Sequence, residues 1–505
     1  MRIVLMRAAI MLSMVTTTTA LSSPRSPVVA MSSAAAATPV VPFEDWAEAN
    51  NINAPKLAVT GTADLRGVVV LDDIAVGEEL CCVPRTTCLD LSAVEGSGSP
   101  CEAMVPTPLW GALRWYERLA CWLLAEQRLG EASPVSGYMG YLPGPNQFAD
   151  APLTWNEEEL TVLSYPPLAA SIREQQQELL SLHDALRKAG GALAASVSLD
   201  ELRWAQQLVL SRAFTSTIAT PLEVAKRAPP PPPPPISPAV VTARMWFGGL
   251  PLIGDMINEK PPPPPPPPLG DGLDMAMMPM LDAFNHRSDA SNACAYDGKR
   301  NAFVLTANAR LREGEQAYIS YGAKTNDELL QLFGFTEEEN PYDNFLSIGL
   351  AEYLQSPAAG LFSTPEAAQS RFAALSALRL EEALVGELTA TSVPPQTMHA
   401  LRVLVGTNEE LLKASKLAQR ASLQTEEQVW AAMRGYCKMA RSAMGGPRKA
   451  DLAGAKQARS RSASDPRRAM ALEFRAEKKR LLSELESRLT LVAARSRKAG
   501  KPLKI

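Results

Sequence analysis

The chain has 505 residues, of which 46% are hydrophobic and 21% are charged. This composition argues against a disordered chain and predicts a mostly globular protein of two or three domains, and its 50 basic and 54 acidic residues are nearly balanced. The seven cysteines include no C-x-x-C pair and no histidine at ligand spacing, which disfavours a zinc cluster and a secreted disulfide framework and favours reduced, buried thiols in a reducing compartment.

Residues 1–42 are expected to be a targeting segment and not part of the fold. They contain three arginines and no acidic residue, and the apolar stretch at 8–20 is too short to span a membrane. A stretch rich in Ser, Ala and Pro follows at 21–41, an order typical of a signal followed by a transit peptide. We therefore expect removal of this segment and a plastid (chloroplast) location; a secretory signal alone, a mitochondrial location and a cytoplasmic location are the alternatives.

The segment 65–84 combines β-branched residues with a turn signal at 76–78, which predicts two strands joined as a hairpin. Apolar residues then recur at helical steps in 109–129, and the helical character continues, with interruptions, to residue 214. A helical insertion at about 105–210 is therefore expected to interrupt the part of the chain that forms sheets.

Two proline runs, at 229–235 and 261–268, predict an insertion at about 220–272. Proline cannot donate a ladder hydrogen bond, so each run should form a polyproline II rod of roughly 20 to 25 Å. The apolar residues between the runs allow two interpretations, a lid or a disordered low-complexity insert, and the second is favoured. Strand character resumes at 273–283 and continues, with interruptions, to residue 321.

Beyond residue 340 the pattern becomes almost wholly helical, and we expect a separate helical domain at 346–505. Within 466–494, apolar residues recur at steps near three, four and seven, namely Met470, Phe474, Leu481, Leu485, Leu489 and Val492. Residues 434–505 hold 20 basic and 6 acidic residues, a local excess of 14 positive charges. A solvated basic helix face is the favoured interpretation, and a contact surface for an acidic protein, a nucleic acid or a membrane is the alternative.

Five short strings follow one another along the chain, and their order is informative: a Gly-containing turn at 64–67, SRAF at 211–214, DAFNH at 282–286, YISYG at 318–322 and GF at 334–335. In this order they resemble the SET-domain methyltransferases, and more narrowly the Rubisco large-subunit lysine methyltransferase group, which includes the actin histidine methyltransferase. Further strings between 136 and 160 and between 465 and 482 extend the resemblance to about 43–500.

The resemblance implies an α+β fold. A SET domain of short strands would occupy 43–345 and contain both the helical and the proline-rich insertions. An all-α domain that binds the substrate protein would follow at 346–505. The lack of Cys-rich flanks suits this group, because histone-type SET enzymes often carry zinc clusters beside the domain.

The resemblance implies that Tyr321 is the catalytic residue, with its hydroxyl beside the sulfonium methyl group and the incoming nitrogen. On spacing alone, the favoured interpretation of Tyr321 is a core tyrosine whose hydroxyl is bonded to backbone. Only the ordered set of strings makes the catalytic role the favoured one. Tyr318 is expected to pack in the core. Asn285 and His286 would hold the cofactor, although His286 is also typical of a structural histidine. The chemistry requires no metal ion and no general-base His or Glu.

Ten residues are implied to bind S-adenosyl-L-methionine: Asp64, Leu65, Arg66, Gly67, Ser211, Arg212, Asp282, Asn285, His286 and Phe333. Backbone groups at 64–66 would approach the amino-acid portion of the cofactor, and Gly67 would allow a close approach that a Cβ would block. The family commonly has glycine where this chain has Leu65, which puts the affinity for the cofactor in question. Arg212 would face a carboxylate or cap its helix, and Phe333 would stack on adenine or pack in the core.

The expected function is protein-lysine N-methylation, in which a methyl group passes in line from S-adenosyl-L-methionine to a neutral lysine amine of a non-histone protein. Rubisco large subunit or a plastid aldolase is the suggested substrate, and an acidic surface on it would suit the basic C-terminal stretch. Two alternatives stay open: protein-histidine methylation, and a catalytically decayed SET scaffold that binds partners through its proline runs. We expect no nucleic-acid partner and no transmembrane segment in the mature chain, and make no prediction of the oligomeric state.

Overall fold

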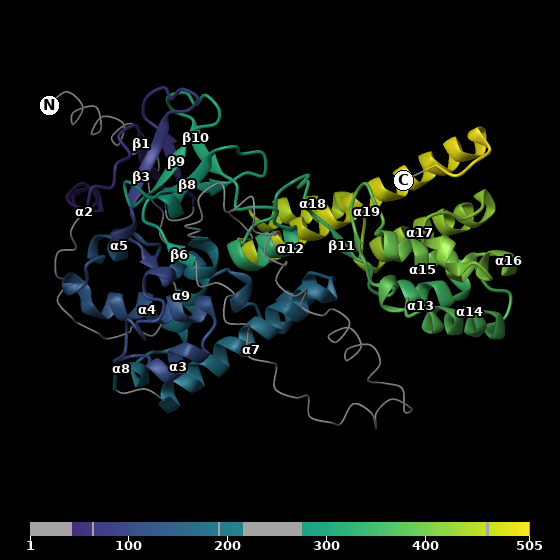
Figure 1. Ribbon diagram of the computed structural model, residues 1–505, viewed down its shortest axis with the longest axis horizontal. Helices are drawn as coiled ribbons and strands as arrows, with labels where there is room; N and C mark the ends of the chain where they lie inside the picture. The colour runs from purple at the N-terminus through teal and green to yellow at the C-terminus, as the bar shows by residue number, and fades with distance from the viewer. Residues whose placement is uncertain (1–42, 63–64, 190–191, 216–274, 461–463, 504–505) are drawn as a thin grey trace. The chain divides into compact units, whose positions relative to one another are not determined.

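The computed structural model describes residues 43–62, 65–189, 192–215, 275–460 and 464–503, which are coloured from purple to yellow along the chain in Figure 1. The targeting segment, the proline-rich insertion and Asp64 lie outside these residues, so what was expected of them stays a prediction. Among the described helices, none combines the length and the apolar run that crossing a membrane requires.

Small sheets form the N-terminal part of the described chain. A four-stranded sheet has the order β1 (Leu57–Thr62), β2 (Leu65–Val70), β10 (Gln316–Ile319) and β7 (Asn285–His286). A second sheet has the order β3 (Glu79–Pro84), β9 (Ala302–Thr306) and β8 (Ala293–Asp297), and a third has the order β4 (Leu89–Asp90), β6 (Met275–Met277) and β5 (Ala213–Thr215). The pairing of β10 with β7 is parallel, so the segments that follow these two strands leave the sheet at the same edge.

The predicted hairpin at 65–84 is wrong, although both of its strands exist. β2 pairs with β1 and β10, whereas β3 pairs with β9. The turn itself is present, since Gly77 has a φ of 84° and its N–H donates to the carbonyl of Ala307 at 2.7 Å. Consecutive buried residues in β3 need partners from distant parts of the chain, and a local turn signal cannot identify them.

Helices fill the predicted helical insertion, namely α3 (Thr107–Ala112), α4 (Trp115–Leu129), α5 (Ser136–Tyr141), α6 (Glu157–Val162), α7 (Pro166–Ala189), α8 (Ala192–Ala195) and α9 (Leu199–Arg212). α9 begins at a capping box, in which the Ser198 hydroxyl accepts from the Glu201 N–H at 3.2 Å and the Glu201 carboxylate accepts from the Ser198 N–H at 2.9 Å. It ends where β5 begins, so the string SRAF runs from a helix into a strand. This places Arg212 at the junction of the two.

The C-terminal part is largely helical, as predicted, apart from an antiparallel pair of short strands, β11 (Phe345–Leu346) and β12 (Glu387–Leu388). Its helices are α13 (Leu350–Gln355), α14 (Pro365–Ala377), α15 (Pro395–Val405), α16 (Asn408–Leu411), α17 (Leu423–Ala443), α18 (Arg448–Ala458) and α19 (Pro466–Ala499). The apolar stripe predicted within 466–494 is buried, and α19 packs along both α17 and α18.

The buried side chains form two hydrophobic clusters. The first gathers residues of the sheets and of α2 (Phe43–Ala49), α4, α5 and α9, and the second gathers residues of the C-terminal helices. Residues of α6 and of the first part of α7, which lie inside the predicted helical insertion, belong to the second cluster, as does Leu330. The seven cysteines are free, and all except Cys294 are buried.

Candidate active site

Tyr321 and the Asn-His dipeptide lie side by side, because β10 pairs in parallel with β7 and sets Tyr318 beside Asn285 and Ile319 beside His286. The Tyr321 N–H donates to His286 Nδ1 at 3.0 Å. The Tyr321 hydroxyl donates to the backbone carbonyl of Phe284 at 2.8 Å. The phenol is thus fixed next to the DAFNH string, although Tyr321 and Phe284 are 37 positions apart in the chain.

His286 supports the backbone of Tyr321 from the side. Its Nδ1 accepts a hydrogen bond, so the neutral ring carries its proton on Nε2, which lies 3.5 Å from Glu337 Oε2. Burial lowers the pKa of His286, and the nearby Glu337 carboxylate opposes this shift. A neutral ring at neutral pH can hold Tyr321 in place without exchanging protons with a substrate.

Aromatic rings surround the phenol. The Phe333 ring stacks on Tyr321 with centroids 4.7 Å apart, and the His286 ring lies 5.0 Å away on a tilt of 30°. Phe333 is the last residue of a π-helix, Leu329–Phe333, that ends at Gly334 with a left-handed φ of 77°. Burial raises the pKa of Tyr321 to about 12, so the phenol stays protonated at neutral pH.

A pocket of about 360 Å³ opens beside Tyr321. Its lining includes predicted site residues, namely Ser211, Arg212, Asp282, Tyr321 and Phe333. Its wall also contains side chains that were not predicted, including Trp115, Phe214, Phe284 and Lys324. The lining therefore combines aromatic rings with one acidic and two basic groups.

Arg212 and Asp282 form a charged pair in this pocket. The Arg212 guanidinium donates to the Asp282 backbone carbonyl and lies 3.8 Å from the carboxylate oxygen Oδ2, which also accepts from the Tyr138 hydroxyl at 3.0 Å. Burial raises the pKa of Asp282, and Arg212 and Arg66 oppose that shift. Within the described residues, Arg212 Nε and Asp282 Oδ1 are buried without a hydrogen-bond partner. One donor and one acceptor of this pair are thus not used by the described residues.

The predicted turn at 64–67 is wrong for residues 65–67, because Leu65, Arg66 and Gly67 lie in β2 and pair with Thr62, Gly61 and Thr60 of β1. This end of β2 meets the rest of the site through Asn285, whose Nδ2 donates to the Arg66 carbonyl at 2.8 Å. A Cβ on Gly67 would lie 2.0 Å from Gln316 Nε2 and 2.9 Å from Asn285 Nδ2. The glycine therefore permits a close approach of these two side chains, and the predicted close approach of a cofactor at Gly67 stays a prediction. Leu65 is the first residue of β2 and pairs with Thr62.

Two of the predicted side chains use their polar groups locally. The Ser211 hydroxyl donates to the carbonyls of Gln207 at 2.8 Å and Leu208 at 3.1 Å. Arg66 donates to the Tyr141 carbonyl at 2.5 Å, and its guanidinium lies over the Tyr141 ring at 3.8 Å from the centroid. The structure thus presents Ser211 as a support of the pocket wall and Arg66 as a link from β2 to Tyr141. In the described part of the chain, no group of three or more His, Cys, Asp or Glu side chains is arranged to hold a metal ion.

The C-terminal part matches a known family. Residues 364–482 match the family model described as Rubisco LSMT substrate-binding. Over 89 residues the chain is 32% identical to ribosomal lysine N-methyltransferase 4 of Schizosaccharomyces pombe, an alignment that covers 17% of this chain and 19% of that protein. Over 67 residues it is 30% identical to SET domain-containing protein 4 of Mus musculus, covering 13% and 15%. The alignments thus span less than a fifth of either relative.

Solved structures match nearly the whole chain. The SET domain of LSMT bound to lysine and AdoHcy aligns with a TM-score of 0.56 and 18% identity over 91% of this chain and 95% of that one. Rubisco LSMT bound to AdoMet aligns with the same TM-score and identity over 90% and 91%. The chain therefore has the SET-domain fold followed by a largely helical region, which confirms the predicted α+β fold.

Proposed function

We propose that this chain is a protein-lysine methyltransferase that uses S-adenosyl-L-methionine. The observation that carries the proposal is the Tyr321 phenol, which is fixed by His286 and by the Phe284 carbonyl and lines a pocket with aromatic walls. One relative is a ribosomal lysine N-methyltransferase, and solved structures of the same fold hold lysine with AdoHcy, or AdoMet. These similarities support the same activity.

The residues of the pocket fit the proposed cofactor. The unpartnered Arg212 Nε is a donor suited to a carboxylate, because a guanidinium binds planar anions in a fixed geometry. The stacked rings of Tyr321 and Phe333 offer an aromatic surface for a heterocycle. When bound, S-adenosyl-L-methionine would supply an electrophilic methyl group. Asn285 would act by holding the start of β2 in place, since its amide already donates to the Arg66 carbonyl.

The acceptor amine must arrive without its proton. A lysine in water has a pKa of about 10.4, and an apolar wall lowers that value by desolvating the ammonium form. In this pocket the rings of Trp115, Phe214 and Phe284 would provide such a wall. The proton would leave to water, and the neutral nitrogen would then be ready to accept the methyl group that S-adenosyl-L-methionine supplies when bound.

Tyr321 would orient the amine during this step. The Tyr321 hydroxyl donates its hydrogen bond to the Phe284 carbonyl. The lone pairs of the phenol oxygen are therefore free to accept a hydrogen bond from the attacking nitrogen. Because burial raises its pKa to about 12, the phenol would stay neutral and act through its position and dipole. No proton needs to pass through His286.

The acceptor in this proposal is a protein, because the C-terminal region matches a substrate-binding family model. Rubisco large subunit or a plastid aldolase is the proposed acceptor, and a plastid is the proposed location. The signal-like and transit-like order of residues 1–42 supports the location.

The proposal is tested by methyl transfer with a matched control. The full chain, its Tyr321→Phe form and its Tyr318→Phe form are incubated with tritiated S-adenosyl-L-methionine and plastid extract. Tyr318→Phe removes a hydroxyl three residues before Tyr321, in β10. That hydroxyl donates to Gln316 Oε1 at 2.6 Å, and the variant should label like the wild type. Tyr321→Phe should lose labelling by about a hundredfold or more.

Two results would count against the proposal. Equal labelling by the wild type and Tyr321→Phe would remove Tyr321 from its proposed role. Methylhistidine, rather than methyllysine, in the hydrolysed product would change the acceptor to histidine. Calorimetry with millimolar S-adenosyl-L-methionine completes the test, because a wild-type chain that binds no cofactor would be a scaffold and not an enzyme.

A further inference from the structure

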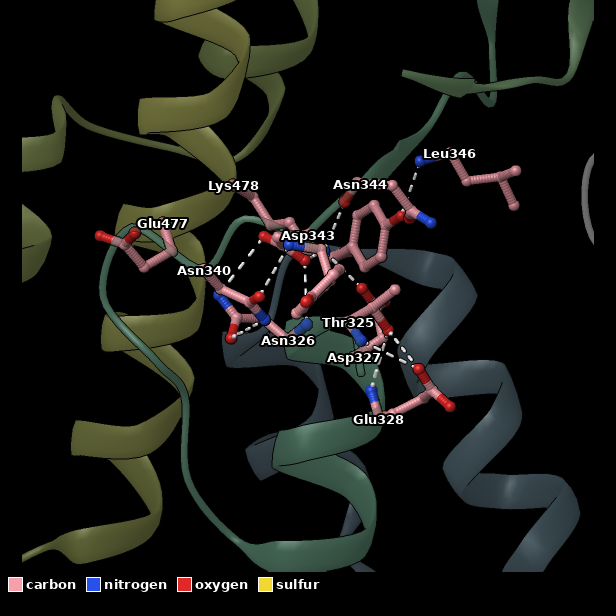
Figure 2. A network of polar contacts seen from close by, with 12 residues as sticks. Thr325, Asn326, Asp327, Glu328, Asn340, Asp343, Asn344, Leu346, Glu477 and Lys478 are labelled. Carbon is pink, nitrogen blue, oxygen red and sulfur yellow. Dashed lines mark hydrogen bonds and ion pairs between the residues drawn. The ribbon is translucent and has the colours of Figure 1, made fainter. Parts of the chain in front are cut away.

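Lys478, on α19, is a charged side chain without exposed surface, and it lies within the stretch that matches the substrate-binding family model. Its ammonium group donates to Asp343 Oδ1 at 2.8 Å, to the Asn344 carbonyl at 2.6 Å and to Asp327 Oδ2 (Figure 2). An ammonium group has three donors, so all are used. The three acceptors belong to the segment that follows Tyr321 in the chain.

The charge of Lys478 is held firmly in this site. Burial works against the charged form, but the carboxylates of Asp327 and Asp343 outweigh it and raise the pKa of Lys478 above its usual value. The Phe474 and Tyr165 rings lie 5.0 and 5.5 Å from the ammonium nitrogen and add a cation–π contribution. Removing the lysine would therefore leave two carboxylates without their shared partner.

Asp343 extends the contact to Asn326, the first residue of α12 (Asn326–Glu328). Its carboxylate accepts from the Asn326 N–H at 2.9 Å and from the side-chain Nδ2 at 3.3 Å. The Asn326 side chain accepts from the Glu337 N–H at 3.0 Å and donates to the Glu337 carbonyl at 3.1 Å. Asn326 has no exposed surface, so water does not compete for these bonds. They close a loop that contains the π-helix with Phe333.

Glu337 completes the path to the candidate site. Its Oε1 accepts from the Ser288 N–H at 2.9 Å, and its Oε2 lies 3.5 Å from His286 Nε2. The other ring nitrogen of His286 accepts from the Tyr321 N–H at 3.0 Å. Within the described residues Glu337 Oε2 has no hydrogen-bond partner, so the step from Glu337 to His286 is an approach of 3.5 Å between a carboxylate oxygen and Nε2 and not a hydrogen bond. With that step, a set of contacts leads from Lys478 in the helical region to the backbone of Tyr321.

We propose that Lys478 is a positioning residue: through this path of contacts it holds His286, and with it Tyr321, in place. The C-terminal helical region then completes the site in addition to any part it has in binding a substrate. The expected effect on rate rests on the proposed function. The expected effect on His286 does not, because it is measured without methyl transfer.

Two other basic residues of α19 separate positioning from stabilisation. Lys479 is also buried and donates to Asp451 Oδ2 at 2.5 Å and to two glycine carbonyls just before α18, so its partners belong to the helical region. Arg467 pairs with Glu159 of α6 at 2.8 Å, so it joins α19 to the helical insertion. Lys479→Met and Arg467→Ala are therefore matched controls for buried charge and for docking of α19.

The first readout is nuclear magnetic resonance of histidine. The chain has only three histidines, so ¹³C-labelled Cε1–H signals of the full chain can be assigned with His183→Gln and His399→Gln. We expect Lys478→Met to shift the His286 signal and to leave the other two in place. The shift follows from movement of Glu337, the charged group that faces the ring.

The controls decide the interpretation of that shift. Lys479→Met and Arg467→Ala should leave the His286 signal where it is in the wild type. Asp343→Asn weakens the same path without removing the lysine and should shift His286 in the same selective way, so it replaces Lys478→Met if that variant does not fold. An unmoved His286 signal, or an equal shift in Lys479→Met, overturns the proposal.

The second readout is the rate of methyl transfer to the acceptor protein that the labelling experiment identifies. Lys478→Met should lower kcat by about ten- to a hundredfold with little change in KM, because a small misplacement of a reacting group lowers the rate of the chemical step. The kcat of Lys479→Met should stay within about twofold of the wild type. A rise in KM alone would assign Lys478 to substrate binding and overturn its role in positioning. If the wild type transfers no methyl group, the proposed function fails, and the His286 signal alone tests Lys478.

Discussion

Tyr321 is held at its backbone, its hydroxyl and its ring. Its N–H is bonded to His286, its hydroxyl to the Phe284 carbonyl and its ring stacks on Phe333. A phenol fixed in this way contributes a defined position and a neutral dipole, and its acidity is suppressed by burial. This distinguishes it from a general base, which needs a pKa near the working pH.

The pH dependence of methyl transfer should reflect this neutral phenol. Because the pKa of Tyr321 is about 12, its hydroxyl is protonated below that pH and begins to ionise only above about pH 11. We expect kcat to rise from pH 7 to pH 10 as the acceptor amine loses its proton, without a falling limb from Tyr321. A falling limb with a midpoint below pH 10 that vanishes in Tyr321→Phe would contradict this expectation.

Gly67 offers a second test at the residue scale. In Gly67→Ala, the new Cβ would meet Gln316 Nε2 at 2.0 Å and Asn285 Nδ2 at 2.9 Å. We expect a loss of about 1–3 kcal/mol in the free energy of unfolding, as is typical of overpacking, measured by urea denaturation. Adding Gln316→Ala removes the closer contact and should recover part of the loss. No recovery would show that displacement of Asn285 is the main cost.

At the scale of elements, the strand and helix ends bring the motif strings together. The parallel pairing of β10 and β7 aligns Tyr318 with Asn285, and the junction of α9 with β5 places Arg212 beside Asp282. Motif residues at the ends of elements have backbones held by hydrogen bonds and side chains free to face a pocket. The same principle explains why the predicted strings lie at junctions and not in the middle of helices.

The packing of α2 on α5 is testable through a glycine. A Cβ on Gly137 in α5 would lie 2.3 Å from the Trp46 ring of α2, whereas a Cβ on Gly111 in α3 would have no neighbour within 4 Å. Gly137→Ala should lower the free energy of unfolding by about 1–3 kcal/mol. Gly111→Ala should leave it unchanged or raise it by up to about 1 kcal/mol, because alanine favours helix. Equal urea midpoints for both variants would mean that α2 does not pack tightly on α5.

At the scale of the whole molecule, the basic C-terminal stretch is partly neutralised within the chain. Among the described residues, at least ten of its basic side chains form ion pairs: Lys438, Arg441, Arg448, Arg459, Arg467, Arg475, Lys478, Lys479, Arg480 and Arg497. Some of the carboxylates, such as Glu159 and Asp327, come from the N-terminal part. The local excess of positive charge is thus a weaker reason to expect an acidic partner than the sequence suggested.

Buried and exposed ion pairs of this stretch should differ in their contribution to stability. Lys479→Met leaves the buried Asp451 carboxylate, which Arg475 also contacts, short of a partner and should lower the free energy of unfolding by about 3–5 kcal/mol. The side chain of Lys438 is 66% exposed in its pair with Glu486. Lys438→Met should therefore lower the free energy of unfolding by less than about 1 kcal/mol. Thermal unfolding of the two variants checks this, and similar melting temperatures would contradict it.

The candidate site was predictable where one short string contained the whole signal. Tyr321, Asp282 and Arg212 line the pocket, and their strings had singled them out. Tyr138, which bonds Asp282, lies inside a string that contributed to the resemblance, so a signal for it was present. No sequence pattern singled out Glu337, because its role depends on the fold of the segment after Tyr321, which brings the Glu337 carboxylate close to His286.

The sequence by itself determined the helical and strand-forming segments, the buried stripe of α19 and the order of the motif strings, because these properties reside in consecutive residues and their periodicity. Only the tertiary structure decided that β3 pairs with β9 and not with β2, that Gln316 and Asn285 fill the space beside Gly67, and that Lys478 reaches the segment after Tyr321. Each of these contacts joins groups far apart in the chain. Their meeting depends on how two buried clusters pack in three dimensions, and no local pattern specifies it.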